Sequence, residues 1–189
     1  MTTLMLTTAL TMALVQASPL RVPPQMPIDQ APAAAEFESR VNAYVSLHRR
    51  LEGTVPTIAV STDYAQVVAA IDVLGTKIRA ARQDARRGDV FTPDVECWIR
   101  QMIDNSLRGC DINALRAALN EEHPPNLKFT LTINGRWPTG ASLGPMPPQL
   151  LADLPPLPDH LEYRFLDRDL VLWDAHANLV VDFIRAVLR

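Results

Sequence analysis

An acidic residue and a histidine near the C-terminal end are the first candidates for chemistry. Asp174 and His176 lie two positions apart, just past a predicted strand end, where side chains can converge at a sheet rim. A carboxylate beside an imidazole can orient that ring as a general base or as a metal ligand. Glu162 and Asp182 are expected nearby. The commoner arrangement for such a pair is a capped turn with a local hydrogen bond, so both interpretations stay open.

The four histidines show no spacing typical of a metal-binding motif such as H-E-x-x-H. They are His48, His123, His160 and His176. Motifs therefore predict no metal and no cofactor. Residues 140–144 do match the G-x-S-x-G nucleophile motif of hydrolases, which requires a strand, a sharp turn and a long helix. The flanking prolines at 138, 145, 147 and 148 exclude an immediate long helix, so a glycine-containing loop is favoured.

Three arginines, Arg79, Arg82 and Arg86, are expected on one side of a helix, away from its apolar residues. Such a row can bind an anionic ligand or partner, although it more commonly forms a solvated face paired with neighbouring carboxylates. The chain has 18 Lys and Arg against 21 Asp and Glu, a net charge of −3. It lacks the basic surplus of a nucleic-acid-binding domain, so no nucleic-acid partner is predicted.

The elements that position these residues are clearest at the C-terminal end. Apolar and polar residues alternate over 161–166 and again over 169–174, which is typical of half-buried strands. A two-residue turn at Asp167-Arg168 sets the register of the hairpin. The register pairs Phe165 with Leu170, Tyr163 with Leu172, and Leu161 with Asp174.

This register gives the hairpin one large apolar face, which other elements must cover. The helical stripes that include Val67, Ile71 and Leu74, or Trp98 and Met102, are the expected cover. Asn178 is expected to cap a closing helix. Its apolar face would hold Val180, Phe183, Ile184 and Val187.

Four helices are predicted before the hairpin, from apolar residues spaced three and four apart, at about 37–51, 64–85, 93–108 and 112–119. A strand is expected at 127–133 before an Asn134-Gly135 turn, and a short helix at 149–154. The fold class is therefore α+β, with about four N-terminal helices packed on a small, mostly antiparallel sheet, a C-terminal hairpin and a closing helix. A continuous third helix separates Cys97 from Cys110 by more than disulfide reach.

The N-terminal region predicts export. Residues 1–17 are uncharged and largely apolar, with small residues before the end, as in a signal peptide that is too short to span a membrane. Residues 18–35 are rich in proline and are interpreted as a linker, and 36–189 as one α+β domain. The expected location is periplasmic or extracellular, with no transmembrane span in the mature chain.

Three stretches carry a resemblance: GDVFTP at 88–93, LPPLP at 154–158 and LEYRFLDRDLVLWDAHANLVVDFI at 161–184. Over most of 37–188 the chain resembles a family of bacterial exported proteins of unassigned function. The resemblance implies export and a shared fold, and it carries over no catalytic residue. We therefore expect an exported, non-enzymatic binding or assembly domain with a possible protein partner in the cell envelope. The alternative is a small periplasmic hydrolase or metal-dependent enzyme that uses Asp174 and His176.

Overall fold

The computed structural model describes residues 30–55, 64–120, 130–137 and 146–189. The predicted signal peptide, linker residues 18–29, His123 and the motif at 140–144 lie outside these ranges. The described part is an α+β fold in which helices precede an antiparallel sheet with the strand order β1-β2-β3. Its elements are α1 (Ala31–Glu52), α2 (Tyr64–Ala81), α3 (Pro93–Ser106), α4 (Ile112–Asn120), α5 (Pro148–Asp153), β1 (Leu161–Leu166), β2 (Asp169–Asp174) and β3 (Leu179–Ile184).

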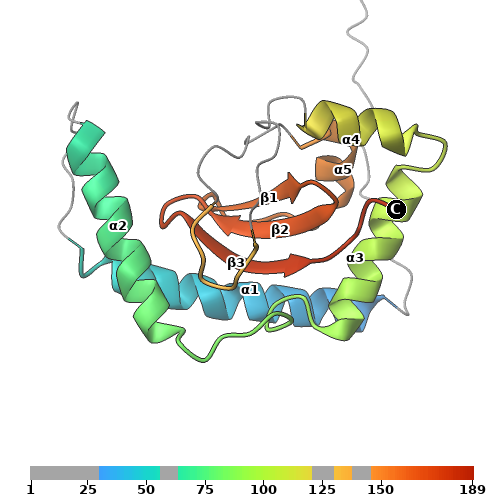
Figure 1. The fold of residues 1–189 in the computed structure, drawn as a ribbon. Helices are drawn as coiled ribbons and strands as arrows, with labels where there is room; N and C mark the ends of the chain where they lie inside the picture. Colours follow the sequence, from blue (N-terminus) through green and yellow to red (C-terminus); the bar gives the residue numbers. More distant parts are fainter. Residues whose placement is uncertain (1–29, 56–63, 121–129, 138–145) are drawn as a thin grey trace, which may run out of the picture.

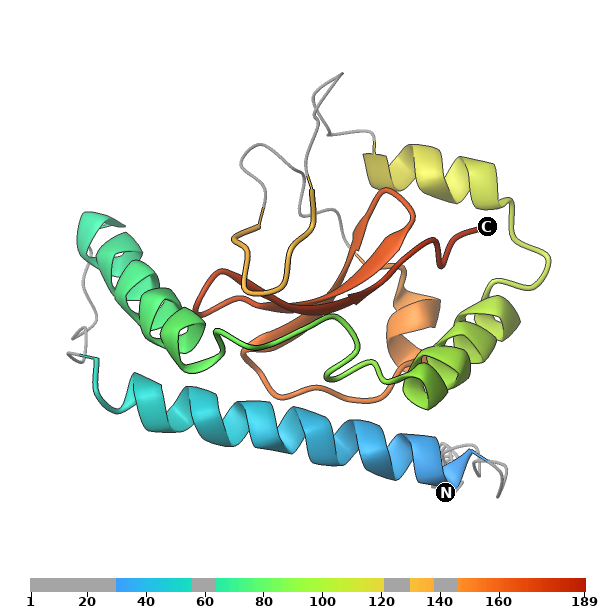
Figure 2. The same ribbon diagram turned by 60° about the horizontal axis from the view of Figure 1, so that its bottom comes forward.

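The longest helix, α1, runs along the sheet, with α2 and α3 at its opposite ends (Figures 1 and 2). Its buried side chains recur at helical spacing, as predicted: Phe37, Val41, Tyr44, Val45 and His48. The helix begins at Ala31, so the last residues of the predicted linker are helical. In the described part, no helix combines the length and the apolar character that crossing a membrane requires.

The second helix ends at Ala81, earlier than its apolar pattern predicts, because the chain after it turns toward the sheet. The Arg82 guanidinium donates to the side chain of Asn134 and to the carbonyl of Val181. Backbone N–H groups of the following loop then bind the buried Asp182 carboxylate. These tertiary contacts outweigh the local helical preference of 82–85.

The predicted hairpin register is confirmed. Phe165 pairs with Leu170, Tyr163 with Leu172 and Leu161 with Asp174, and Asp167 in the turn has a φ of 54°. The predicted closing helix is wrong, because 179–184 form β3, which pairs with β2. Asn178 has a φ of 47° and ends the turn before β3 instead of capping a helix. A short apolar run fits a strand that is covered on both faces as well as it fits a buried helix.

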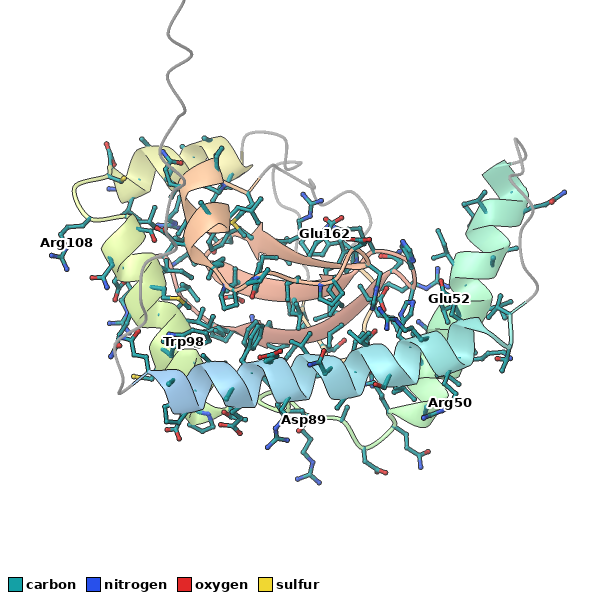
Figure 3. The ribbon with its side chains drawn as sticks, turned by 180° about the vertical axis from the view of Figure 1, so that it is seen from behind. Arg50, Glu52, Asp89, Trp98, Arg108 and Glu162 are labelled. Carbon is teal, nitrogen blue, oxygen red and sulfur yellow. The ribbon has the colours of Figure 1, made fainter. Side chains whose placement is uncertain are left out.

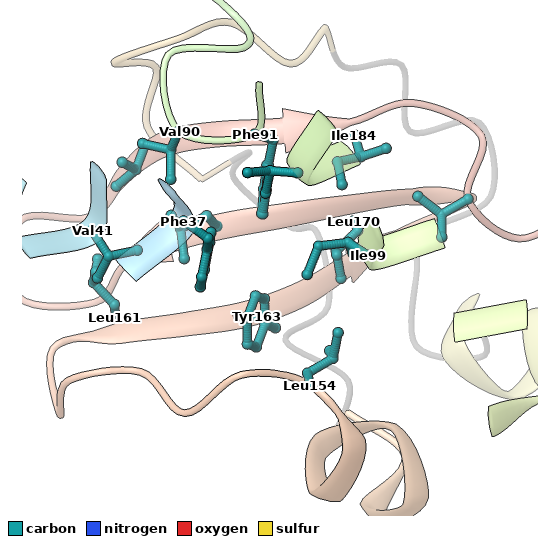
Figure 4. Packing of buried hydrophobic residues seen from close by; sticks show 14 of the residues in the cluster. Phe37, Val41, Val90, Phe91, Ile99, Leu154, Leu161, Tyr163, Leu170 and Ile184 are labelled. Carbon is teal, nitrogen blue, oxygen red and sulfur yellow. The ribbon is translucent and has the colours of Figure 1, made fainter. Parts of the chain in front are cut away.

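Both faces of the sheet are covered, which explains that apolar run. The larger core lies between one face and the helices, where Phe37, Ile99 and Tyr163 pack together with residues from all three strands (Figure 4). On the other face a second cluster packs Leu131 and Trp137 over the strands. Its strand residues are Leu166, Val171, Trp173, Val180 and Phe183.

The strand predicted at 127–133 is absent from its described residues, 130–133, which lead into a turn instead. The Gly135 N–H donates to the carbonyl of Thr132, as the Asn134-Gly135 signal predicts. Asn134 N–H donates to the Val180 carbonyl, and Val180 N–H donates to the Gly135 carbonyl. The turn at Asn134-Gly135 thus forms backbone hydrogen bonds with Val180 of β3 without adding a fourth strand to the sheet.

Candidate metal centre

A cluster of three histidines and two carboxylates lies where the C-terminal half of α1 meets the turn between β2 and β3. We call it the histidine cluster, and its members are His48, Glu52, His160, Asp174 and His176. Asp174 is the last residue of β2 and is fully buried, whereas His176 lies in the turn and is exposed. Glu52 is the last residue of α1, next to the sheet end where this turn lies (Figure 3).

Asp174 is the centre of a buried hydrogen-bond network. Its Oδ2 atom lies 2.6 Å from the hydroxyl of Tyr44 and 2.6 Å from Nδ1 of His48. Its Oδ1 atom accepts the N–H of Ala177 at 2.9 Å. Burial alone would raise the pKa of Asp174, but the hydrogen bonds from His48 and Tyr44 outweigh it and hold the pKa below its ordinary value. The carboxylate is therefore ionised and can only accept hydrogen bonds.

The ionised carboxylate fixes the tautomer of His48. Since Asp174 can only accept, Nδ1 of His48 carries the proton, and the neutral ring has its lone pair on Nε2. This Nε2 atom is buried, has no hydrogen-bond partner in the described part of the chain, and lies 3.7 Å from Oε2 of Glu52. Burial opposes the charged form of the ring, but the hydrogen bond to Asp174 and the charges of Asp174 and Glu52 raise the pKa of His48.

Glu52 connects His48 to the turn that carries His176. Nδ1 of His176 lies 3.6 Å from Oε1 of Glu52, and one ligand atom from each of these three residues lies within 4.8 Å of the others. Ligand atoms at 2.0–2.2 Å from a tetrahedral zinc ion are roughly 3.3 Å apart. The two distances to Glu52 are a few tenths of an ångström longer, and all three ligand atoms lie within 4.8 Å of one another, so the side chains must move closer together to hold one ion.

The donor set selects a class of metal. Two imidazole nitrogens and one carboxylate oxygen suit zinc and neighbouring transition metals, whereas magnesium and calcium prefer oxygen ligands alone. The carboxylate behind His48 is the partner that metal-binding histidines commonly have, because it fixes the ring and makes the free nitrogen a better donor. Tyr44 in turn holds Asp174, and the Arg82 guanidinium lies 5.0 Å from the centre of the Tyr44 ring.

The third histidine, His160, lies directly before β1 and packs on the other two. Its ring stacks on that of His48, with centroids 4.1 Å apart, and lies 5.9 Å from the ring of His176. Its Nε2 atom is buried and has no hydrogen-bond partner among the described residues. Burial and the nearby charge of His48 lower the pKa of His160, so its ring is neutral at pH 7.

The residues that the sequence singled out in this region have the following places in the structure. Asp174 and His176 both belong to the cluster, but Asp174 binds His48 and caps its own turn through Ala177. Glu162 forms an ion pair with Arg164 instead. The buried Asp182 accepts N–H groups from Gly88, Val90, Phe91 and Phe183, which is a structural role.

The predicted arginine row is not formed. Since α2 ends at Ala81, Arg82 and Arg86 lie beyond the helix that carries Arg79. Arg79 donates to Thr76, Arg82 is half-buried against Asn134 and Val181, and Arg86 is exposed.

Sequence reasoning missed Tyr44, His48, Glu52 and His160. A usable signal was that Tyr44, His48 and Glu52 follow one another at intervals of four residues, which places them on the same face of α1. What joins that line to Asp174 is a contact across 126 residues of sequence, which no local pattern encodes.

A hollow of about 510 Å³ lies elsewhere and shares no residue with the histidine cluster. Its lining consists of Arg87, Gly88, Phe91, Pro93, Glu96, Cys97 and Arg100. Cys97 and Cys110 are both free and exposed.

Comparisons of the chain with protein-family models, with curated proteins and with solved structures found no match.

Proposed function

We propose that the chain is a binding domain for one divalent transition-metal ion of the zinc class, held by His48, Glu52 and His176. The observation that carries the proposal is the convergence of these three ligand atoms around a histidine whose other nitrogen is bound by a buried carboxylate. Two of the ligands are half-exposed, so an ion can reach them from solvent.

The burial of the hydrogen-bond network around Asp174 also supports metal binding. The side chains of His48 and Asp174 are almost fully removed from water, and Nε2 of His48 has no hydrogen bond to any residue that the structure describes. An unsatisfied buried nitrogen costs free energy that a metal ion would recover. The competing arrangement is an imidazolium that bridges Asp174 and Glu52 as a purely structural ion pair, and it predicts no specific metal affinity.

Binding, rather than catalysis, fits the surroundings of the site. Asp174, the carboxylate expected to activate His176, faces the interior and binds His48 instead. If the leader at 1–17 directs export, the domain would bind metal in the periplasm or outside the cell, where an envelope protein is a possible partner.

Zinc titration of the metal-stripped full chain, in competition with a chromophoric chelator, tests the proposal. Cys97 and Cys110 are alkylated first, because exposed thiols also bind zinc. We expect one zinc ion per chain. In E52Q and in H176Q the zinc affinity should fall by a factor of roughly 10 or more. The matched control is E38Q, which changes an exposed glutamate on the same helix and should bind zinc like the wild type. Failure of the alkylated chain to bind zinc, or an equal loss in E38Q, would sink the proposal.

A further inference from the structure

We infer that His160 is a fourth ligand, which closes the coordination sphere of the ion held by His48, Glu52 and His176. The inference rests on the proposed function and extends it, because a closed set of three imidazoles and one carboxylate leaves no position for a reacting water. Structural and storage sites are closed in this way, whereas catalytic zinc sites keep one position open.

The three rings lie close together, but the stacked rings of His48 and His160 must turn before both face one ion. With a zinc–nitrogen distance of 2.0–2.1 Å, a ring centroid lies roughly 3.2 Å from the metal, so two tetrahedral imidazoles have centroids roughly 5 Å apart. The centroid of His48 is 4.1 Å from that of His160 and 6.0 Å from that of His176. The pair His160 and His176 is 5.9 Å apart. These separations lie on both sides of the expected value, so the stacked pair must move apart and His176 must move closer when all three rings bind one ion.

His160 is also available as a donor. Its side chain is only 8% exposed, and its buried Nε2 atom has no hydrogen-bond partner in the described ranges. Buried polar atoms are rarely left in that state unless a ligand or ion completes them.

The backbone holds His160 next to the turn that carries another ligand. The carbonyl of His160 accepts the N–H of Ala175 at 2.9 Å, so the residue before β1 is fixed to the residue next to His176. His48 and Glu52 approach from α1 on the other side. The four ligands thus come from three segments that already meet.

Cobalt(II), a spectroscopic substitute for zinc, tests the inference in the alkylated full chain. In the wild type, azide should leave the visible spectrum of the bound cobalt unchanged, because no coordination position is open. In H160A, cobalt affinity should fall by at least a factor of roughly 10, and azide should now change the spectrum. Added imidazole should occupy the vacated position in H160A and restore resistance to azide.

The outcomes separate the two proposals. A wild-type chain that binds cobalt but responds to azide overturns the role of His160 and leaves the metal site standing. The same holds if H160A binds cobalt with wild-type affinity and an unchanged spectrum. A wild-type chain that binds no cobalt or zinc overturns both. The wild-type azide measurement stays decisive even if H160A does not fold.

Discussion

Replacing Asp174 with asparagine should weaken zinc binding although Asp174 does not touch the ion. The amide keeps an oxygen for the N–H of Ala177, so its nitrogen takes the place of Oδ2. That nitrogen is a donor, and it faces two donors, the Tyr44 hydroxyl and Nδ1 of His48. His48 can accept a hydrogen bond from this amide only if its proton moves from Nδ1 to Nε2. That move removes the lone pair directed at the ion.

The expected magnitude follows from this change of tautomer. Loss of a carboxylate behind a metal-binding histidine costs about 10–100-fold in affinity. Because asparagine also reverses the tautomer, we expect a loss near the upper limit, about 100-fold or 2.7 kcal/mol. The variant should also lower the free energy of unfolding, because its amide donor faces two buried donors.

The assay is the chelator competition with the alkylated chain, combined with urea unfolding so that affinities refer to folded protein. D169N is the matched control, since Asp169 begins the same strand, carries the same charge and contacts Arg185 and Ala186 at the far end. It should bind zinc like the wild type. Wild-type affinity in D174N, or an equal loss in D169N, would refute the proposed role of the carboxylate.

Three further measurements test the fold and the charges of the cluster. Phe165→Ala should lower the free energy of unfolding in urea by about 3–5 kcal/mol, because the ring is buried in the larger core; a loss below about 1 kcal/mol would contradict that packing. Gly75→Ala should lower the free energy of unfolding by on the order of 1–3 kcal/mol, although alanine is the better helix former. The reason is that the added Cβ would lie 2.6 Å from the carbonyl oxygen of Ala177. A gain in stability would show that the turn can move. In the metal-free chain, NMR titration should place the pKa of His48 above 6.5 and that of His160 below it, because carboxylates outweigh burial only at His48; the reverse order would contradict the network. The stabilisation from His48 should accordingly be complete below pH 6.5 and be lost as the pH rises through its folded pKa.

The fold was predictable where local pattern and turn chemistry agree. Alternation over 161–174 and the turn at Asp167 defined the register, since a slip of one residue would expose the apolar face. The pattern failed at 179–184, where every residue is buried and the sequence therefore shows no strand alternation. The cover of the second sheet face by Leu131 and Trp137 was not visible locally either.

Only the part of the candidate site that lies on β2 and the following turn was predictable from the sequence. Asp174 and His176 are recognisable because they follow a strand, but their chemistry depends on partners from α1. His48 reaches Asp174 only because a helix of 22 residues runs along the sheet and brings its C-terminal turn to this end. Contacts of such separation come from tertiary packing and not from spacing.

Anomalous X-ray diffraction at the zinc absorption edge, on crystals of the chain grown with zinc, tests the central claim most directly. We predict one strong anomalous peak within about 2.0–2.2 Å of Nε2 of His48, a carboxylate oxygen of Glu52 and a ring nitrogen of His176. No peak between these three residues, or zinc bound only at Cys97 or Cys110, would contradict it.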